Sequence, residues 1–273
     1  MKSAISALLF FAIAFQTFQA ELSAQDYRIY TKVSHQQGSS SGQTPKVVAR
    51  TLTICHAGKI YDYMVGVEEL VVYDPHHQRF TVISSPYHMA CTVEFSELRQ
   101  HLKVARSQAK EYLKALGESQ LPNAYKKAEL VAFQLDPHFK MEFSPEKNLL
   151  SCTSPQMSYL VKTVRAPSPE MADAFRQYTD WAAQLNFVLH GKSSMPAPRI
   201  QLNKYLVEHQ LLPVEVTLTL ADSENTKLVA EHIIDWKLSK DDRFKITNWK
   251  HELRDGNLKF VSFHEYRKKL LAR

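Results

Sequence analysis

Two Asp-Pro-His triplets, Asp74-Pro75-His76 and Asp136-Pro137-His138, are the residues best suited by type and spacing to carry out chemistry. An aspartate beside an imidazole can bind a metal ion or transfer a proton. Asp-Pro is also typical of turns, and both triplets fall where we predict a hairpin to reverse. We therefore interpret both as turn residues, and retain Asp74, His76 and Asp136 only as the site of an alternative function, a secreted hydrolase.

Other combinations of metal ligands are weak. His88 and Cys91 form an H-x-x-C pair without a second pair at ligand spacing, and a structural zinc site needs about four ligands. The acids Asp222, Glu224 and Asp241-Asp242 are interpreted as exposed residues of polar turns between strands. The 7 glycines include no G-x-G pair, which disfavours a nucleotide-binding loop. We expect no catalytic residue, no metal site and no cofactor.

The three cysteines, Cys55, Cys91 and Cys152, permit at most one intramolecular bridge. Cys91 and Cys152 both alternate onto apolar faces of predicted strands. We favour buried free thiols. A Cys91–Cys152 disulfide and a catalytic thiol are the alternatives.

The first 20 residues are typical of a signal peptide, with a basic start and an apolar run of 12 residues from Ala4 to Phe15. Cleavage is expected after Ala20 or Ala24. No later stretch reaches the 18 apolar residues of a membrane-spanning helix, so we expect no transmembrane segment after cleavage. The predicted location is the periplasm or the exterior.

The N-terminal half of the chain reads as antiparallel hairpins. A turn at Ala57-Gly58 pairs Ile54 with Tyr61 and Leu52 with Tyr63 on one face, and Thr53 with Asp62 on a polar opposite face. A second hairpin joins 70–73 to 80–83 across the Asp74 turn, and a strand follows at 89–95. A flexible polar loop is expected at 36–44.

Helices and strands alternate irregularly after that point. A helix is predicted at 96–116, with an apolar stripe of seven residues from Leu98 to Leu116. Further helices are expected at 168–191 and 200–208. Strands are predicted at 130–135, 140–143, 149–153, 158–164, 214–220, 228–238 and 244–249, and a last hairpin at Asp255-Gly256 that pairs Leu253 with Leu258.

This order indicates an α+β fold: a curved antiparallel sheet, or incomplete barrel, whose concave face is covered by amphipathic helices. Residues 25–273 are predicted to form one domain, with a weak possible boundary at 195–198. Aromatic and aliphatic residues on one curved face are predicted to line an apolar ligand cavity, with a filled core as the alternative. These residues are Leu52, Ile54, Tyr61, Tyr63, Phe80, Val82, Val93 and Phe95.

Positive charge is concentrated at the C-terminal end of the chain. The formal net charge is +6, and residues 237–273 hold 11 lysines and arginines against 5 acids, so the remaining residues hold 23 of each sign. This segment is interpreted as the solvated face of a sheet, or as a docking surface for an anionic partner. A basic row on the helix at 96–116 has the same two interpretations: Arg99, Lys103, Arg106, Lys110 and Lys114. Nucleic acid is not an expected partner of an exported protein.

Several short segments are similar to the periplasmic lipoprotein-carrier superfamily, which includes LolA-like, LolB-like and RseB-like proteins. Ala57-Gly58-Lys59-Ile60-Tyr61-Asp62-Tyr63 resembles a hairpin of that family, and 69–75 with Arg79-Phe80 resembles the strands that follow it. Leu212–Val216, Asp235-Trp236 and Phe244–Ile246 resemble its closing strands. The resemblance implies an unclosed antiparallel barrel with a helical lid that binds acyl chains or partner proteins without catalysis.

These observations favour an exported, non-catalytic binding or carrier protein for an apolar ligand, such as an acyl lipid or a lipoprotein, or for an exported protein. The first alternative is an envelope scaffold protein that docks an anionic partner through its basic C-terminal sheet. The second is the secreted hydrolase. The ligand and the oligomeric state are not predicted.

Overall fold

A computed structural model describes residues 26–36, 45–190, 194–222 and 226–271. The predicted signal peptide and almost all of the polar loop predicted at 36–44 lie outside these residues. No helix in the described ranges is long and apolar enough to cross a membrane.

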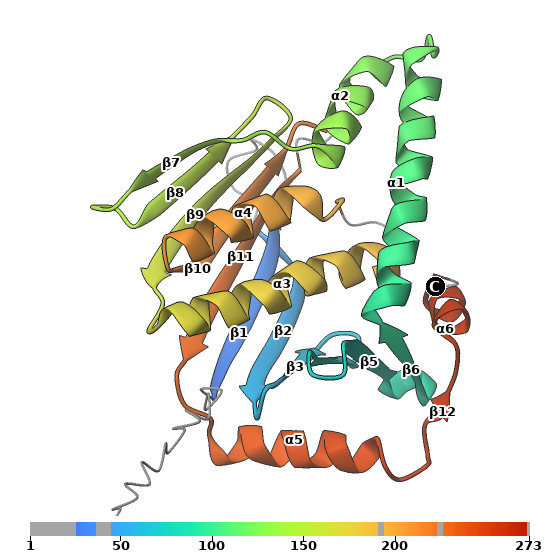
Figure 1. The fold of residues 1–273 in the computed structure, drawn as a ribbon, viewed down its shortest axis with the longest axis vertical. Coiled ribbons are helices and arrows are strands. Elements are labelled where there is room, and N and C mark those ends of the chain that lie inside the picture. The colour runs from blue at the N-terminus through green and yellow to red at the C-terminus, as the bar shows by residue number, and fades with distance from the viewer. Residues whose placement is uncertain (1–25, 37–44, 191–193, 223–225, 272–273) are drawn as a thin grey trace, which may run out of the picture.

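All twelve described strands belong to one twisted sheet that is open at both edges (Figure 1). The strand order is β12-β6-β5-β4-β3-β2-β1-β11-β10-β9-β8-β7, and every neighbouring pair is antiparallel except β12 and β6. The strands are β1 (Tyr27–Gln36), β2 (Lys46–His56), β3 (Lys59–Met64), β4 (Glu69–Asp74), β5 (Arg79–Ser84), β6 (Met89–Glu94), β7 (Lys140–Ser144), β8 (Leu149–Thr153), β9 (Met157–Arg165), β10 (Leu211–Leu220), β11 (Lys227–Asp235) and β12 (Lys259–Phe260).

Strand β1 connects the two halves of the sheet. It pairs with β2 on one side and with β11, about 200 residues later in the chain, on the other. Strands β2 to β6 form a meander of hairpins, and β7 to β11 form the second half. The predicted α+β class and open antiparallel sheet are confirmed, whereas the single-domain assignment stays a prediction.

Six helices complete the described chain: α1 (Phe95–Gly117), α2 (Ala124–Leu135), α3 (Pro169–His190), α4 (Ala197–Glu208), α5 (Lys240–Glu252) and α6 (Phe263–Leu271). Helices α3 and α4 lie side by side across one face of the sheet, as the covering helices were predicted to do (Figure 1). Helix α5 covers part of the opposite face, which was not predicted.

The hairpin registers agree with the sequence. Ile54 lies opposite Tyr61 and Leu52 opposite Tyr63, as predicted for a turn at Ala57-Gly58. Ala57 and Gly58 both have positive φ, which is the conformation that a two-residue turn of this type requires.

Three segments fold differently from the prediction. Residues 130–135 belong to α2 and residues 244–249 to α5, so both predicted strands are wrong. Leu253 ends α5, so it forms no hairpin with Leu258, and β12 instead pairs in parallel with β6. The described part of the basic segment, residues 237–271, is therefore mainly helical, and β12 supplies its strand residues.

Local chemistry explains why 240–252 is a helix. The Ser239 hydroxyl accepts a hydrogen bond from the Asp242 backbone N–H, and the Asp242 carboxylate accepts from the Ser239 backbone N–H, which completes a capping box. Ile246 then faces the sheet in a cluster with Ile54 and Tyr61, and Trp249 packs on the rings of Tyr61 and Tyr63. Asp242 is fully buried, in contrast to the prediction of an exposed turn acid.

The cysteines are all buried free thiols, which confirms the favoured interpretation and excludes the Cys91–Cys152 bridge. Cys55 and Cys91 lie in the core between the sheet and α3, whereas Cys152 lies in a separate core beneath α4. Burial raises the pKa of Cys91 and of Cys152 to about 12, so neither thiol is ionised near neutral pH.

Candidate functional site

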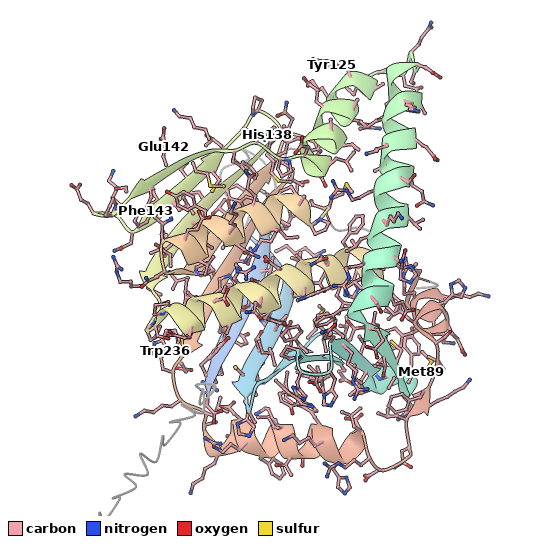
Figure 2. The ribbon with its side chains drawn as sticks, in the orientation of Figure 1. Met89, Tyr125, His138, Glu142, Phe143 and Trp236 are labelled. Atoms are coloured by element: carbon pink, nitrogen blue, oxygen red, sulfur yellow. The ribbon has the colours of Figure 1, made fainter. Side chains whose placement is uncertain are left out.

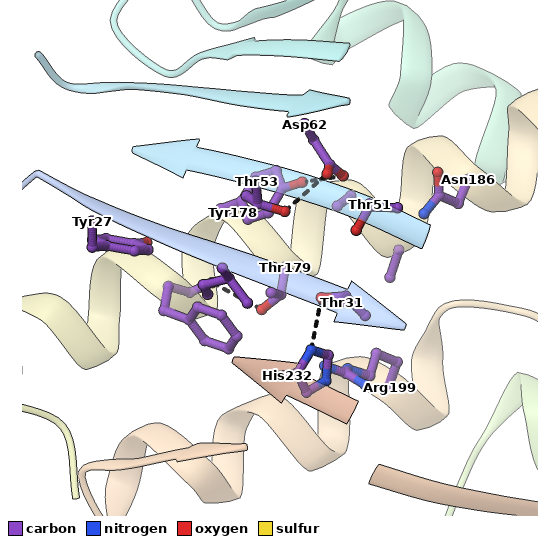
Figure 3. A pocket seen from close by; sticks show the side chains of 14 residues that line it. Tyr27, Thr31, Thr51, Thr53, Asp62, Tyr178, Thr179, Asn186, Arg199 and His232 are labelled. Carbon is purple, nitrogen blue, oxygen red and sulfur yellow. Dashed lines mark hydrogen bonds between the residues drawn. The ribbon is translucent and has the colours of Figure 1, made fainter. Parts of the chain in front are cut away.

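A cavity of about 290 Å³, open to solvent, lies between the sheet and helices α3 and α4. Strands β1, β2, β3 and β11 form its floor, and Figure 3 shows the side chains that converge on it. The lining consists of Tyr27, Ile29, Thr31, Thr51, Thr53, Asp62, Phe175, Tyr178, Thr179, Ala182, Ala183, Asn186, Arg199 and His232.

Because side chains alternate between the two faces of a strand, the strand register determines which polar residues form the floor of the cavity. Tyr27, Ile29 and Thr31 alternate on one face of β1, and the register with β2 sets Thr53 opposite Ile29 and Thr51 opposite Thr31. On the other side of β1, His232 of β11 lies opposite Thr31. A stripe of polar side chains therefore crosses the middle of the sheet beneath α3.

Asp62 connects this floor to α3. Its carboxylate accepts hydrogen bonds from the Thr53 hydroxyl at 2.8 Å and from the Tyr178 hydroxyl at 2.7 Å. Burial raises the pKa of Asp62, and the two hydrogen bonds oppose that rise. Burial and the neighbouring Asp62 hold the pKa of Tyr178 well above its usual value, so this hydroxyl remains a donor. The three residues fix the helix on the sheet.

His232 offers a polar atom that faces no protein partner. Its Nδ1 lies 2.9 Å from the Thr31 hydroxyl, while its Nε2 is buried and has no hydrogen-bond partner among the described residues. Burial, followed by the positive charge of Arg199, lowers the pKa of His232 to about 4. The imidazole is therefore neutral at pH 7.

The positive charge near His232 comes from the guanidinium of Arg199. Its Nε donates to the Asn203 side-chain oxygen at 3.0 Å, and the Asn203 amide donates to Asp180 at 2.8 Å. Asp180 is paired directly with Arg176, so an amide separates its carboxylate from Arg199. Within the described ranges Arg199 forms no ion pair, although a guanidinium remains protonated in proteins. The cavity thus holds a cation without a direct counter-ion.

The Thr31–His232 pair is the arrangement in the cavity that most resembles a catalytic one. Thr31 and His232 form a hydroxyl–imidazole pair, but a histidine with a pKa of about 4 is a weak base at neutral pH. No described group orients its second nitrogen, as the third member of a catalytic triad would. The described residues also include no group of three histidine, cysteine or acidic side chains placed to hold a metal ion.

The eight residues predicted to line a cavity do not share one face, so that part of the prediction is wrong. Leu52, Ile54, Tyr61 and Tyr63 belong to the cluster beneath α5. The other four lie on the face beneath α1 and α3, and all are packed in the core there: Phe80, Val82, Val93 and Phe95. None of the eight lines the cavity described above. Ligand binding by these residues stays a prediction.

The Asp-Pro-His triplets lie apart and have different settings. Asp74 does lie in a hairpin turn, where the Lys59 ammonium at 2.6 Å and His77 donate to it, and these contacts hold its pKa below the usual value against the effect of burial. Asp136 and His138 follow α2, not a hairpin, and both side chains are more than four-fifths exposed (Figure 2). The structure does not assemble them into one site.

The sequence analysis identified one polar pair of the site but predicted that this pair faces solvent. The pairing of Thr53 with Asp62 was predicted, as the polar side of a half-buried sheet. Arg199 and His232 were not singled out at all. The available signal was the alternation Tyr27, Ile29, Thr31 on β1, which places a threonine on an otherwise apolar face.

A second hollow of about 280 Å³ lies near the C-terminus, between the start of β4 and helices α3 and α6. Glu69 is buried at its base and accepts a hydrogen bond from Tyr266 at 3.0 Å, and His190 lies 3.6 Å from its other oxygen. These contacts anchor α6 on the sheet, so we assign the cluster a structural role.

No family model matches the chain, and no curated protein matches it. Among solved structures, the chain is similar to a LolA superfamily protein from Nitrosomonas europaea. The aligned residues are 5% identical and cover 81% of this chain and 90% of that one, with a TM-score of 0.28.

Proposed function

We propose that the protein is an exported, non-catalytic binding or carrier protein. Its ligand is a small amphiphile with an acidic head group, such as a fatty acid or part of an acyl lipid. The ligand binds in the cavity beneath α3 and α4, and the periplasm is the proposed location.

The observation that carries this proposal is the pair formed by Arg199 and His232. Among the described residues, a guanidinium without a direct counter-ion and a buried imidazole nitrogen without a hydrogen-bond partner lie in the same cavity. A carboxylate or phosphate provides a negative charge for the guanidinium and an acceptor for the imidazole, and arginine binds such groups through two parallel hydrogen bonds. The neutral His232 donates from Nε2 when the Thr31 hydroxyl donates to Nδ1.

The remaining lining supports an apolar tail. Part of the cavity wall consists of aromatic and aliphatic side chains: Tyr27, Ile29, Phe175, Ala182 and Ala183. The alanines leave room beneath α3 where larger side chains would fill it. The volume of about 290 Å³ is at the small end of ligand sites, which favours a short chain or one that extends into solvent.

Isothermal titration with decanoate and with decanol tests the proposal, because the two probes share a tail and differ in head group. We expect the wild-type protein to bind decanoate at least tenfold more tightly than decanol. Arg199→Gln should remove that preference, since a hydrogen bond to a charged group contributes about 1.5–3 kcal/mol. Arg243→Gln is the matched control, because Arg243 is exposed and pairs with Asp26 on the other side of the fold.

Equal affinity for the two probes would contradict the acidic head group. A preference for decanoate that survives Arg199→Gln would place the head group elsewhere.

A further inference from the structure

The distal part of α1 and the start of α2 form a helical arm, defined here as residues 103–127. Helix α1 begins in the core, where Phe95 and Leu98 are buried. Farther along, only Leu116 is buried, where α1 packs on α2. Figure 1 shows α1 running from the sheet past the end of α3 to a tip formed with α2. The predicted apolar stripe on this helix is thus mostly not buried.

The arm exposes apolar and aromatic side chains that packing within the protein does not use. Leu121 and Tyr125 at the tip are 71% and 74% exposed, and Figure 2 shows Tyr125 near the tip, at the start of α2. Val104 and Tyr112 on α1 are 56% and 49% exposed. A helical hairpin gains no stability from exposing such residues, which points to a partner at the tip.

The arm is also basic. It contains Glu111 and Glu118 against six positive residues, a net charge of 6 − 2 = +4. Arg106 is tied to α2 by a hydrogen bond to the Leu135 carbonyl. The other five are lysines with exposed positions along α1 and on the first turn of α2: Lys103, Lys110, Lys114, Lys126 and Lys127. The partner must therefore carry negative charge.

We propose that this arm docks on the surface of an anionic lipid bilayer. Leu121 and Tyr125 enter the head-group region, and the lysines contact the lipid phosphates. Lysine beside leucine and tyrosine is the composition of membrane-interface segments, whereas protein interfaces are depleted in lysine.

The inference stands on the arm alone. Each lysine near an anionic membrane contributes an attraction that falls off within about 10 Å at ordinary ionic strength. Binding should therefore depend on anionic lipid and weaken with added salt.

Co-sedimentation of the full chain with vesicles tests the proposal. We expect binding to vesicles of phosphatidylglycerol and phosphatidylcholine, and at least tenfold weaker binding to phosphatidylcholine alone. The double variants Leu121→Glu/Tyr125→Glu and Lys126→Glu/Lys127→Glu should each lose at least tenfold in affinity. These positions are exposed, so circular dichroism should show the wild-type fold.

Phe244→Glu/Lys250→Glu is the control, since α5 is also basic and Phe244 is 66% exposed. Unchanged membrane binding in this variant supports the arm. Loss in the control with retention in the arm variants would assign the docking surface to α5 and overturn the proposal. Self-association that disappears in Leu121→Glu/Tyr125→Glu, with no vesicle binding, would overturn it in favour of a second copy of the chain.

Discussion

Arg199 and His232 show how two residues set the electrostatics of the cavity. The guanidinium raises the cost of a second positive charge beside it, so it acts with burial to keep the imidazole neutral. Asn203 positions Arg199 through Nε and connects it to Asp180 without neutralising it directly. This arrangement gives the proposed anion site its positive charge before any ligand binds.

The low pKa of His232 predicts a loss of stability in mild acid. An unfolded histidine titrates near 6.5, whereas His232 in the folded protein has a pKa of about 4. Between these values the unfolded chain binds more protons, so the contribution is fully present above pH 6.5 and is lost as the pH falls towards 4. The cost approaches about 3 kcal/mol.

Urea unfolding at pH 7 and at pH 4.5 measures this effect. The replacement His232→Gln does not titrate, so the difference in unfolding free energy between the two pH values should shrink by up to about 3 kcal/mol. His138→Gln, at an exposed position, is the control and should keep the wild-type difference. An unchanged pH dependence in His232→Gln would show that this imidazole is not held neutral by burial beside Arg199.

Residue pairing within a hairpin was predictable, but its surroundings were not. Alternation and a two-residue turn were enough to pair Thr53 with Asp62, because both depend on neighbouring residues. The partner that decides the role of this pair is Tyr178, which comes more than 100 residues later. The polarity of Thr53 and Asp62 suggested that they face solvent, whereas Asp62 accepts a hydrogen bond from Tyr178 of α3.

At the scale of elements, α5 shows how a helix can read as a strand. Phe244–Thr247 alternates apolar and polar residues, which favours a strand over this short stretch. The capping box at Ser239 and Asp242 starts a helix instead, and Ile246 and Trp249 then lie three residues apart on its buried side. Residues 130–135 were also predicted as a strand and are helical. They continue α2, which begins at Ala124 with residues that favour a helix, such as alanine, lysine and glutamate.

The observed helix and the strand predicted for 244–249 imply different outcomes for a pair of substitutions. In the helix, Ile246 is 2% exposed and Phe244 is 66% exposed. Ile246→Ala should therefore lower the free energy of unfolding by about 2–4 kcal/mol, and Phe244→Ala by less than about 0.5 kcal/mol. Chemical denaturation measures both. In a strand the two residues share a face, so equal losses would contradict the helix.

At the scale of the whole molecule, the sheet is assembled through its first strand. Short-range patterns predicted most of the hairpins, and the α+β class followed from their order. The pairing of β1 with β11 joins segments about 200 residues apart in the sequence, so local periodicity did not reveal it. The cavity lies where these two strands meet. Its lining residues therefore come from distant segments, 27–62, 175–199 and 232.

The pairing of β1 with β11 also explains why a cavity is found here. Strands β1 and β2 place threonines in the middle of the sheet, and helices α3 and α4 pass over them with alanine, asparagine and arginine on the facing side. Neighbouring parts of the same face carry large apolar residues, which form the cores beneath α3 and α4.

Native mass spectrometry of the mature protein, purified gently from the exporting cell compartment, tests the central claim most directly. We predict that the wild-type protein retains a bound mass that denaturation releases as an acidic amphiphile, and that Arg199→Gln purified in parallel lacks it. A bare wild-type mass that remains unchanged after incubation with decanoate would contradict the account, as would an equal bound mass in both proteins.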